Sequence, residues 1–259
     1  MNVLKLARLF RNVAPHGLRV FFMRVGQFLA PNTFRSVSDI SFPSLNGTLW
    51  CLRSAGYDPS FVVDIGAYHG EWTRAFKKIY PSAQVVMVEA QEKKRPLLDK
   101  VCSELENVSC QTALLGASSG KKVTFCEMET GSSVYEELSS VARTFVEKNL
   151  VSLDDLLKEE RRPVDFLKLD VQGYELEVLR GAARVMSQAH FVLLEVSVLP
   201  YNKSAPLVGD VMRFMGERHF RVFDFCEQMR RGDGFLQQTD ILFVREDGPF
   251  FEKLLTSRA

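Results

Sequence analysis

The sequence predicts an α/β fold, a mostly parallel sheet wound with helices, in which one strand near the end is reversed. Short apolar runs alternate with helix-forming segments from residue 61 onward, as in successive βαβ units. The run 61–65 leads into Gly66 and Gly70 and then into a helix, which is how a nucleotide-binding unit begins. The runs 220–225 and 239–245 are joined by a segment too short for a crossover helix, so we expect an antiparallel hairpin.

The remaining elements follow from the same patterns. Strands are expected at 61–65, 85–89, 108–114, 164–169, 191–196, 220–225 and 239–245. Helices of the domain are expected at 45–55, 71–80, 93–105, 152–160, 174–186 and 207–218. Ser152 is a favourable N-cap, whereas Gly181 weakens the helix that contains it. The segments 121–127 and 141–151, with a turn at 131–133, predict a β-hairpin insertion after the third strand.

Composition narrows the class of protein. The 259 residues are 46% hydrophobic and 25% charged, with a net charge of +1, which does not indicate nucleic-acid binding. No uncharged run is long enough for a membrane-spanning helix. The five cysteines form no CxxC pair, so we expect reduced thiols and a cytoplasmic protein.

The first 55 residues differ from the rest. Residues 1–38 contain six basic residues and no acid, and 3–13 and 18–30 have the apolar spacing of amphipathic helices. We therefore divide the chain into a basic N-terminal extension, 1–55, and a domain, 56–259. Residues 1–30 fit a peripheral contact with an anionic membrane surface, or alternatively a face that packs on the domain or forms a homo-oligomer.

The first candidate site lies around Asp64, Gly66 and Gly70. Gly66 allows a sharp turn after the strand, and Glu89, at the end of the next strand, can accept hydrogen bonds from a ribose diol. The turn lacks the full set of glycines that receives a pyrophosphate, which favours S-adenosylmethionine over a nicotinamide dinucleotide. A nicotinamide-dependent oxidoreductase remains the alternative.

The second candidate site begins at Asp170. A strand ends there, a turn passes through Gly173, and Glu175 begins the next helix. Because open α/β sheets bind ligands at the carboxyl ends of their strands, we expect Asp170 beside the first glycine turn. The alternative is that Asp170 caps the following helix.

Several motifs together resemble the FkbM family of S-adenosylmethionine-dependent methyltransferases, particularly members from surface-sugar and natural-product pathways. They are FVVDIGAYHGEWT, VVMVEA, ALLG, the GSS turn, VSLDDLL, FLKLDVQGYELEVLRGA and the late LLEVSVLPYNKSAPLVGDVMRFMGERHFRVFD with QQTDILFV. The resemblance spans residues 60–245. Members often have Asn where this chain has Tyr68, and Glu where it has Gln172.

The resemblance implies a Rossmann-like methyltransferase fold with seven strands, the last antiparallel, and S-adenosyl-L-methionine as cofactor. Transferred by position, the cofactor-binding residues are Asp64, Gly66, Ala67, Tyr68, Gly70, Glu89, Ala90, Ala113, Leu114 and Asp170. The implied reaction is O-methylation of a hydroxyl on a sugar, glycan or related natural product. A catalytically inactive scaffold with the same fold is a further alternative.

Transfer of a methyl group to a hydroxyl calls for a base. We expect the catalytic residues to be Asp170, Glu195 and Glu175, whereas His69 has a surface role. Asp170 and Glu195 alone do not complete a metal site, so no metal is expected. Substrate contacts are expected from the loop after the Glu195 strand, at Tyr201, Asn202 and Lys203.

Overall fold

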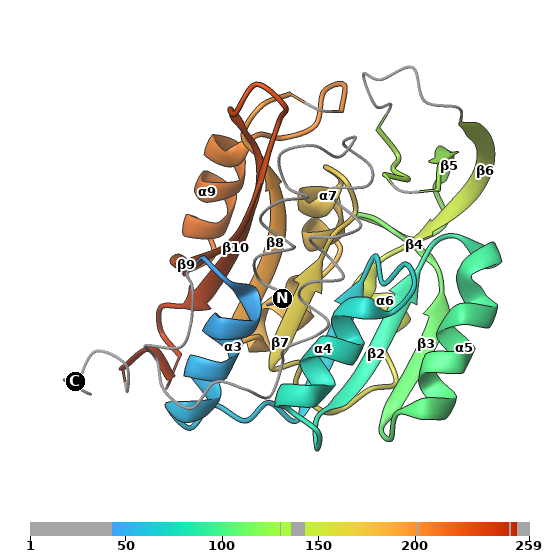
Figure 1. The fold of residues 1–259 in the computed structure, drawn as a ribbon. Helices are drawn as coiled ribbons and strands as arrows, with labels where there is room; N and C mark the ends of the chain where they lie inside the picture. Colours follow the sequence, from blue (N-terminus) through green and yellow to red (C-terminus); the bar gives the residue numbers. More distant parts are fainter. Residues whose placement is uncertain (1–42, 130, 136–142, 201, 249, 253–259) are drawn as a thin grey trace, which may run out of the picture.

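The computed structural model describes residues 43–129, 131–135, 143–200, 202–248 and 250–252 (Figure 1). The two amphipathic helices predicted at 3–13 and 18–30 lie outside these residues. The helix predicted at 45–55 is α3 (Leu45–Ser54), whose apolar side chains Leu45, Leu49 and Leu52 are buried in the domain core. Residues 45–54 therefore pack with the domain.

A seven-stranded sheet forms the centre of the domain, in the order β3-β2-β1-β7-β8-β10-β9. The strands are β1 (Phe61–Ile65), β2 (Gln84–Glu89), β3 (Val108–Thr112), β7 (Phe166–Leu169), β8 (Phe191–Ser197), β9 (Phe220–Arg230) and β10 (Leu236–Arg245). β10 is antiparallel to both β8 and β9, and the other pairs are parallel. The predicted sheet with an antiparallel last strand is thus confirmed.

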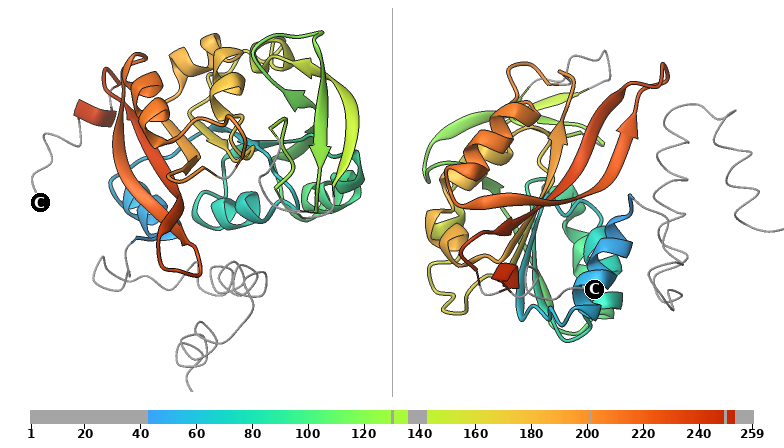
Figure 2. Two further views of the ribbon diagram at one scale, coloured as in Figure 1. Left: turned by 90° about the horizontal axis from the view of Figure 1, so that it is seen from above. Right: turned by 90° about the vertical axis from the view of Figure 1, so that its left-hand side faces the viewer.

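Helices cover both faces of this sheet, as the view from above in Figure 2 shows. The helices of the first face are α3, α4 (Glu71–Ile79) and α5 (Arg95–Glu104), the last preceded by the short 3-10 helix η2 (Glu92–Lys94). Those of the second face are α6 (Leu153–Leu156), α7 (Glu175–Arg180), α8 (Ala183–Gln188) and α9 (Val208–Gly216). Each face has its own apolar core.

The central strand β1 shows why the sequence reads as a continuous apolar run. Phe61, Val63 and Ile65 belong to the core on one face, whereas Val62 belongs to the core on the other. A parallel strand covered by helices on both sides has no exposed face, so apolar residues do not alternate with polar ones.

A second, three-stranded sheet carries the predicted insertion and lies at the upper right of Figure 1. Its strands are β4 (Leu114–Leu115), β5 (Lys122–Glu127) and β6 (Thr144–Val151), in the order β4-β6-β5. β5 and β6 pair antiparallel from Lys122–Asn149 to Glu127–Thr144, which confirms the predicted hairpin. This sheet stands beside the carboxyl ends of β1 and β2.

Several predicted boundaries are wrong. β10 begins at Leu236 rather than at 239, and α6 ends at Leu156 rather than at 160. Three further differences have a visible physical cause. The strand predicted at 108–114 ends at Thr112, because the chain turns at Ala113 and Leu114–Leu115 pairs with β6 instead. The helix predicted at 174–186 is divided into α7 and α8 at Gly181, where a Cβ atom would lie 2.1 Å from the carbonyl oxygen of Gly116. β9 extends five residues beyond the predicted end at 225, because its polar residues form a two-stranded ribbon with β10.

Candidate active site

The point where the sheet reverses its winding direction lies between β1 and β7. The chain passes from β1 outward to β2 and β3, and then returns to β7 on the opposite side of β1. Gly66 and Asp170 follow the carboxyl ends of these two strands, where open α/β sheets bind ligands. Gly66 has a φ of +73°, and a Cβ atom there would lie 1.9 Å from the carbonyl oxygen of Asp170. Only glycine fits this contact.

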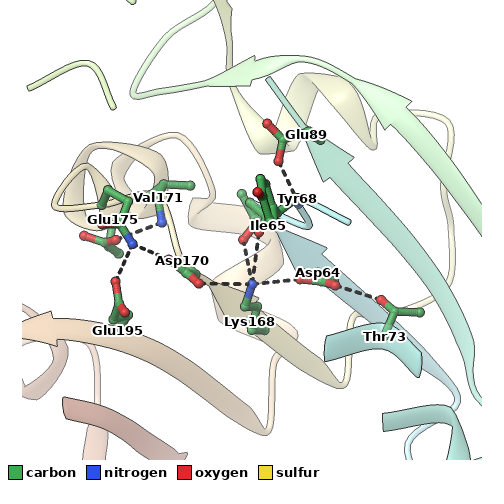
Figure 3. A network of polar contacts seen from close by, with 12 residues as sticks. Asp64, Ile65, Tyr68, Thr73, Glu89, Lys168, Asp170, Val171, Glu175 and Glu195 are labelled. Carbon is green, nitrogen blue, oxygen red and sulfur yellow. Dashed lines mark hydrogen bonds and ion pairs between the residues drawn. The ribbon is translucent and has the colours of Figure 1, made fainter. Parts of the chain in front are cut away.

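Asp64, expected on the cofactor loop, lies within β1 and is completely buried. Its carboxylate accepts a hydrogen bond from the Thr73 hydroxyl at 2.7 Å and pairs with Nζ of Lys168 at 3.0 Å (Figure 3). Thr73 is in the first turn of α4, so Asp64 joins strand, helix and buried cation beneath the loop. It lines neither of the two clefts described below.

Lys168 is a site residue that the sequence analysis missed. Its Nζ lies 3.2 Å from the carbonyl oxygen of Gly66 and 3.9 Å from the carboxylate of Asp170 (Figure 3). Burial alone would lower the pKa of Lys168, but the nearby carboxylates of Asp64 and Asp170 outweigh burial and raise it. A single lysine inside the apolar run FLKL was the available signal, because a buried ammonium requires acidic partners.

Glu89 stands at the end of β2, as predicted. One carboxylate oxygen accepts a hydrogen bond from the backbone N–H of Tyr68 at 2.8 Å, and the other accepts one from that of Gln91 at 2.9 Å. Burial raises the pKa of Glu89, although these backbone bonds partly oppose the shift. The carboxylate is held at the wall of a cleft, with its remaining lone pairs available to a ligand.

The first cleft lies over the carboxyl ends of β1, β2 and β7, beneath the hairpin insertion. Seven of the predicted cofactor-binding residues line it, namely Gly66, Tyr68, Glu89, Ala90, Ala113, Leu114 and Asp170. Phe125 of β5 and residues 131–134 form its opposite wall. Gly70 is elsewhere: it begins α4 with a φ of +78°, and a Cβ atom there would lie 2.8 Å from Val101.

Tyr68 connects the cofactor loop to the hairpin insertion. Its hydroxyl donates to the Glu129 carboxylate at 3.0 Å, and Nζ of Lys94 lies 4.2 Å from the centre of its ring. Lys94 also pairs with Glu129 at 2.6 Å. Hydrogen bonds from Lys94 and Tyr68 lower the pKa of Glu129. The ring of His69 stacks on Tyr68 at 3.6 Å, outside both clefts.

A second and larger cleft, with a cavity volume of about 460 Å³ against about 90 Å³ for the first, lies on the α3 and α4 side. It shares three residues with the first cleft: Gly66, Tyr68 and Asp170. Ala67 and Glu195 line the second cleft alone. The two clefts therefore meet at the switch point of the sheet.

The structure brings Asp170 and Glu195 together through Gln172. The side-chain amide of Gln172 donates to Oδ1 of Asp170 at 2.8 Å and to Oε2 of Glu195 at 2.6 Å. Figure 3 shows both carboxylates pointing toward this shared position, Asp170 from the end of β7 and Glu195 from β8. Two of the three predicted catalytic acids thus form one cluster at the junction of the clefts.

Comparison with known proteins identifies the family of this chain. The sequence profile described as the methyltransferase FkbM domain matches residues 64–222, which is more than half of the chain. The chain belongs to the FkbM methyltransferase family. The predicted family is thereby confirmed, and with it S-adenosylmethionine as the methyl donor.

Solved methyltransferase structures are similar to it at low sequence identity. The magnesium protoporphyrin IX methyltransferase of Synechocystis PCC 6803 with bound SAM is 12% identical, with a TM-score of 0.43, over 95% of this chain and 98% of that one. An rRNA methylase from Streptococcus thermophilus is 12% identical, with a TM-score of 0.47, over 80% and 98% of the two chains. A search of curated proteins found no match to the chain.

Glu175, the third predicted catalytic acid, lines neither cleft. Its carboxylate accepts hydrogen bonds from the backbone N–H groups of Val171 at 3.0 Å and Gly173 at 3.1 Å. Burial raises the pKa of Glu175 to about 7, although these bonds oppose the shift. The structure thus places Glu175 behind the turn that follows Asp170, where it holds the backbone of that turn.

Of the three predicted substrate contacts, Tyr201 lies outside the described residues. Asn202 is buried, and its side-chain amide donates to the carbonyl oxygen of Gln172. Lys203 is exposed. Neither Asn202 nor Lys203 lines the two clefts. Within the described part of the chain, no three His, Cys, Asp or Glu side chains gather as metal ligands.

Proposed function

We propose that this chain is an S-adenosylmethionine-dependent O-methyltransferase that methylates a hydroxyl of a sugar, glycan or related natural product. One observation carries the proposal: two clefts of different character share Gly66, Tyr68 and Asp170. A transferase needs two such sites, because the donor and the acceptor must meet with their reacting atoms aligned.

In this proposal the cofactor occupies the first cleft. Glu89 accepts the ribose hydroxyls, and Ala113 and Leu114 contact the adenine. The side-chain oxygen of the buried Gln91 supports the fit, since it lines this cleft and has no hydrogen-bond partner among the described residues. A buried polar atom of this kind is costly unless a ligand or water satisfies it.

When bound, S-adenosylmethionine supplies an activated methyl group on a sulfonium. The chain supplies alignment and a proton acceptor. Methylation of a neutral hydroxyl releases one proton, and Asp170 and Glu195 are the carboxylates nearest to the shared boundary. Glu175 acts on the position of Asp170 through the backbone of residues 171–173. Lys168 contacts both the carbonyl oxygen of Gly66 and the carboxylate of Asp170, and so fixes their relative positions.

The acceptor occupies the second cleft. Trp72 and Phe76 line it, together with the amides of Asn46, Gln228 and Gln238. An aromatic surface beside several hydrogen-bonding side chains suits a ligand with many hydroxyls. Asn202 would then act indirectly, because its amide holds the carbonyl of Gln172 in the turn after Asp170.

The test has two stages. The purified protein is first titrated with S-adenosylmethionine by calorimetry, together with Asp170→Asn. We expect both proteins to bind the cofactor, Asp170→Asn more weakly, and only the wild type to transfer a labelled methyl group to an extract of surface sugars. A folded protein that binds no cofactor is an inactive scaffold, and undiminished transfer by Asp170→Asn removes that carboxylate from the reaction.

A cytoplasmic location with peripheral membrane contact completes the proposal. None of the helices in the described part of the chain is long and apolar enough to cross a membrane. The basic residues of 1–30 support contact with anionic headgroups, which attract lysine and arginine at about 1 kcal/mol per residue.

A further inference from the structure

Gln172 has an unusual backbone conformation for a residue with a side chain. Its φ is +56°, followed by +96° at Gly173. Positive φ is uncommon outside glycine and costs on the order of 1 kcal/mol, so surrounding contacts must hold it. The carbonyl oxygen of Gln172 accepts hydrogen bonds from the Ser133 hydroxyl at 2.9 Å and from the Asn202 amide. Two separate loops therefore fix this residue.

The side chain of Gln172 uses both of its donor hydrogens on acids. A primary amide nitrogen carries two hydrogens, and here one is directed to Asp170 and one to Glu195. Gln238 donates a further hydrogen bond to Oε2 of Glu195 at 3.1 Å. Both side chains therefore accept a hydrogen bond from this amide.

The charges around this amide are mostly negative. Besides Asp170 and Glu195, which the amide contacts, the elements packed nearby carry the titratable groups Lys168 of β7, Glu175 of α7 and Asp240 of β10. Glu71 and Glu227 line the same second cleft. Lys168 is closer to Asp64, at 3.0 Å, than to Asp170, at 3.9 Å. The neutral amide is thus the group that lies directly between Asp170 and Glu195.

We propose that Gln172 is a positioning residue that holds the carboxylates of Asp170 and Glu195 side by side, so that the pair faces the sulfonium charge of the donor. The inference rests on the proposed function, because the sulfonium is assigned to the boundary that the two clefts share. Two carboxylates held beside one nitrogen repel each other, and the amide offsets this repulsion by donating a hydrogen bond to each. Without the amide, one of the two carboxylates would take up a proton more readily.

The test compares S-adenosylmethionine with S-adenosylhomocysteine, which lacks the methyl group and the positive charge. Gln172→Leu removes both donors with little change in size. The preference of each protein is the ratio of its affinities for the two ligands. At pH 6.5 we expect this ratio to be about three- to tenfold lower in Gln172→Leu than in the wild type, because one carboxylate is then protonated. At pH 8.5 the preference should be largely regained. Gln228→Leu is the control, since Gln228 lines only the second cleft and its side chain accepts a hydrogen bond from Arg230 instead of bridging two acids.

Equal losses of affinity for the two ligands, or a loss that is the same at both pH values, would overturn the proposal. If the wild type binds neither ligand, the proposed function fails. Melting temperatures then test by themselves whether the Gln172 amide joins Asp170 and Glu195. In that case the melting temperature of Gln172→Leu should lie further below that of Gln228→Leu at pH 8 than at pH 5. An equal difference at both pH values would show that the Gln172 amide does not hold the two acids together. If Gln172→Leu does not fold, Gln172→Asn, whose shorter amide reaches one acid only, takes its place in both comparisons.

Discussion

The carbonyl oxygen of Asp170 lies 1.9 Å from the position that a Cβ atom on residue 66 would occupy. This single contact joins the two turns at the switch point of the sheet, one after β1 and one after β7. Neither turn can change without the other.

Gly66→Ala should therefore weaken or abolish cofactor binding and lower the melting temperature, because backbone must shift and the φ of +73° is unfavourable for alanine. Calorimetric titration with S-adenosylmethionine and a thermal melt measure the two effects. Gly209→Ala is the control: residue 209 is in α9, and a Cβ atom there meets no atom within 4 Å. Unchanged binding by Gly66→Ala would show that the contact does not shape the cleft.

Lys168→Met should reduce the free energy of unfolding by about 3–5 kcal/mol, because it leaves Asp64 buried without its cation. Urea titration measures the loss, and the double variant Lys168→Met, Asp64→Asn should recover part of it. Lys100→Met serves as control, since Lys100 is exposed and pairs with Glu104 only at the surface. A loss no larger than that of the control contradicts the role given to Lys168.

Glu175→Gln should become more stable relative to the wild type as the pH rises through 7. The pKa of Glu175 is raised in the folded protein to about 7 from 4.5, so its favourable contribution is complete below pH 4.5 and is lost as the pH passes 7. The glutamine variant lacks that loss, which amounts to at most about 3 kcal/mol at 1.36 kcal/mol per unit. Melting temperatures of both proteins between pH 5 and pH 8.5 provide the check, and a constant difference would contradict it.

Glu89→Gln should weaken S-adenosylmethionine binding about 10- to 100-fold, because the amide replaces one acceptor oxygen with a donor where ribose hydroxyls bind. The backbone bonds to Tyr68 and Gln91 each require an acceptor, so one of them is lost as well. Glu92→Gln, three residues further along and exposed, is the control. Equal affinities for the two variants would move the ribose away from Glu89.

Deletion of residues 1–30 should reduce co-sedimentation with vesicles that contain anionic lipid, because that segment holds basic residues and no acid. Vesicles of neutral lipid should bind both forms weakly. Undiminished binding of the shortened chain to anionic vesicles would assign the segment to the alternative role, packing on the domain or in an oligomer.

The central strands of the sheet could be predicted from the sequence, because strands that are buried on both faces form runs of apolar residues. Apart from Asp64 and Glu89, the runs 61–65 and 85–89 are apolar, because helices cover both sides of the sheet. Boundaries failed where a tertiary contact decided them. Leu114–Leu115 leaves the main sheet for β6, and Gly181 interrupts a helix because the Gly116 carbonyl approaches it. No local pattern contains those partners.

Some residues of the candidate site could likewise be predicted from the sequence, and others could not. Glu89 and Asp170 were found because they end strands, and the parallel sheet gathers strand ends at one edge. Asp64 was placed on the loop although its side chain points into the core toward Lys168. Glu175 was expected at the reacting atoms because it follows Asp170 closely, yet α7 directs it behind the turn. Sequence spacing gives the edge of the sheet but not the direction of each side chain.

The contacts among Tyr68, Lys94 and Glu129 join the loop after β1 to the hairpin insertion. Tyr68 belongs to the wall of the first cleft, whereas Glu129 belongs to the segment that leads from β5 into the opposite wall. A ligand that fills this cleft touches both walls, so its binding free energy and the free energy of keeping the walls joined are reciprocally linked. Whatever strengthens the contacts between the two walls therefore also strengthens the binding of a ligand that touches both of them.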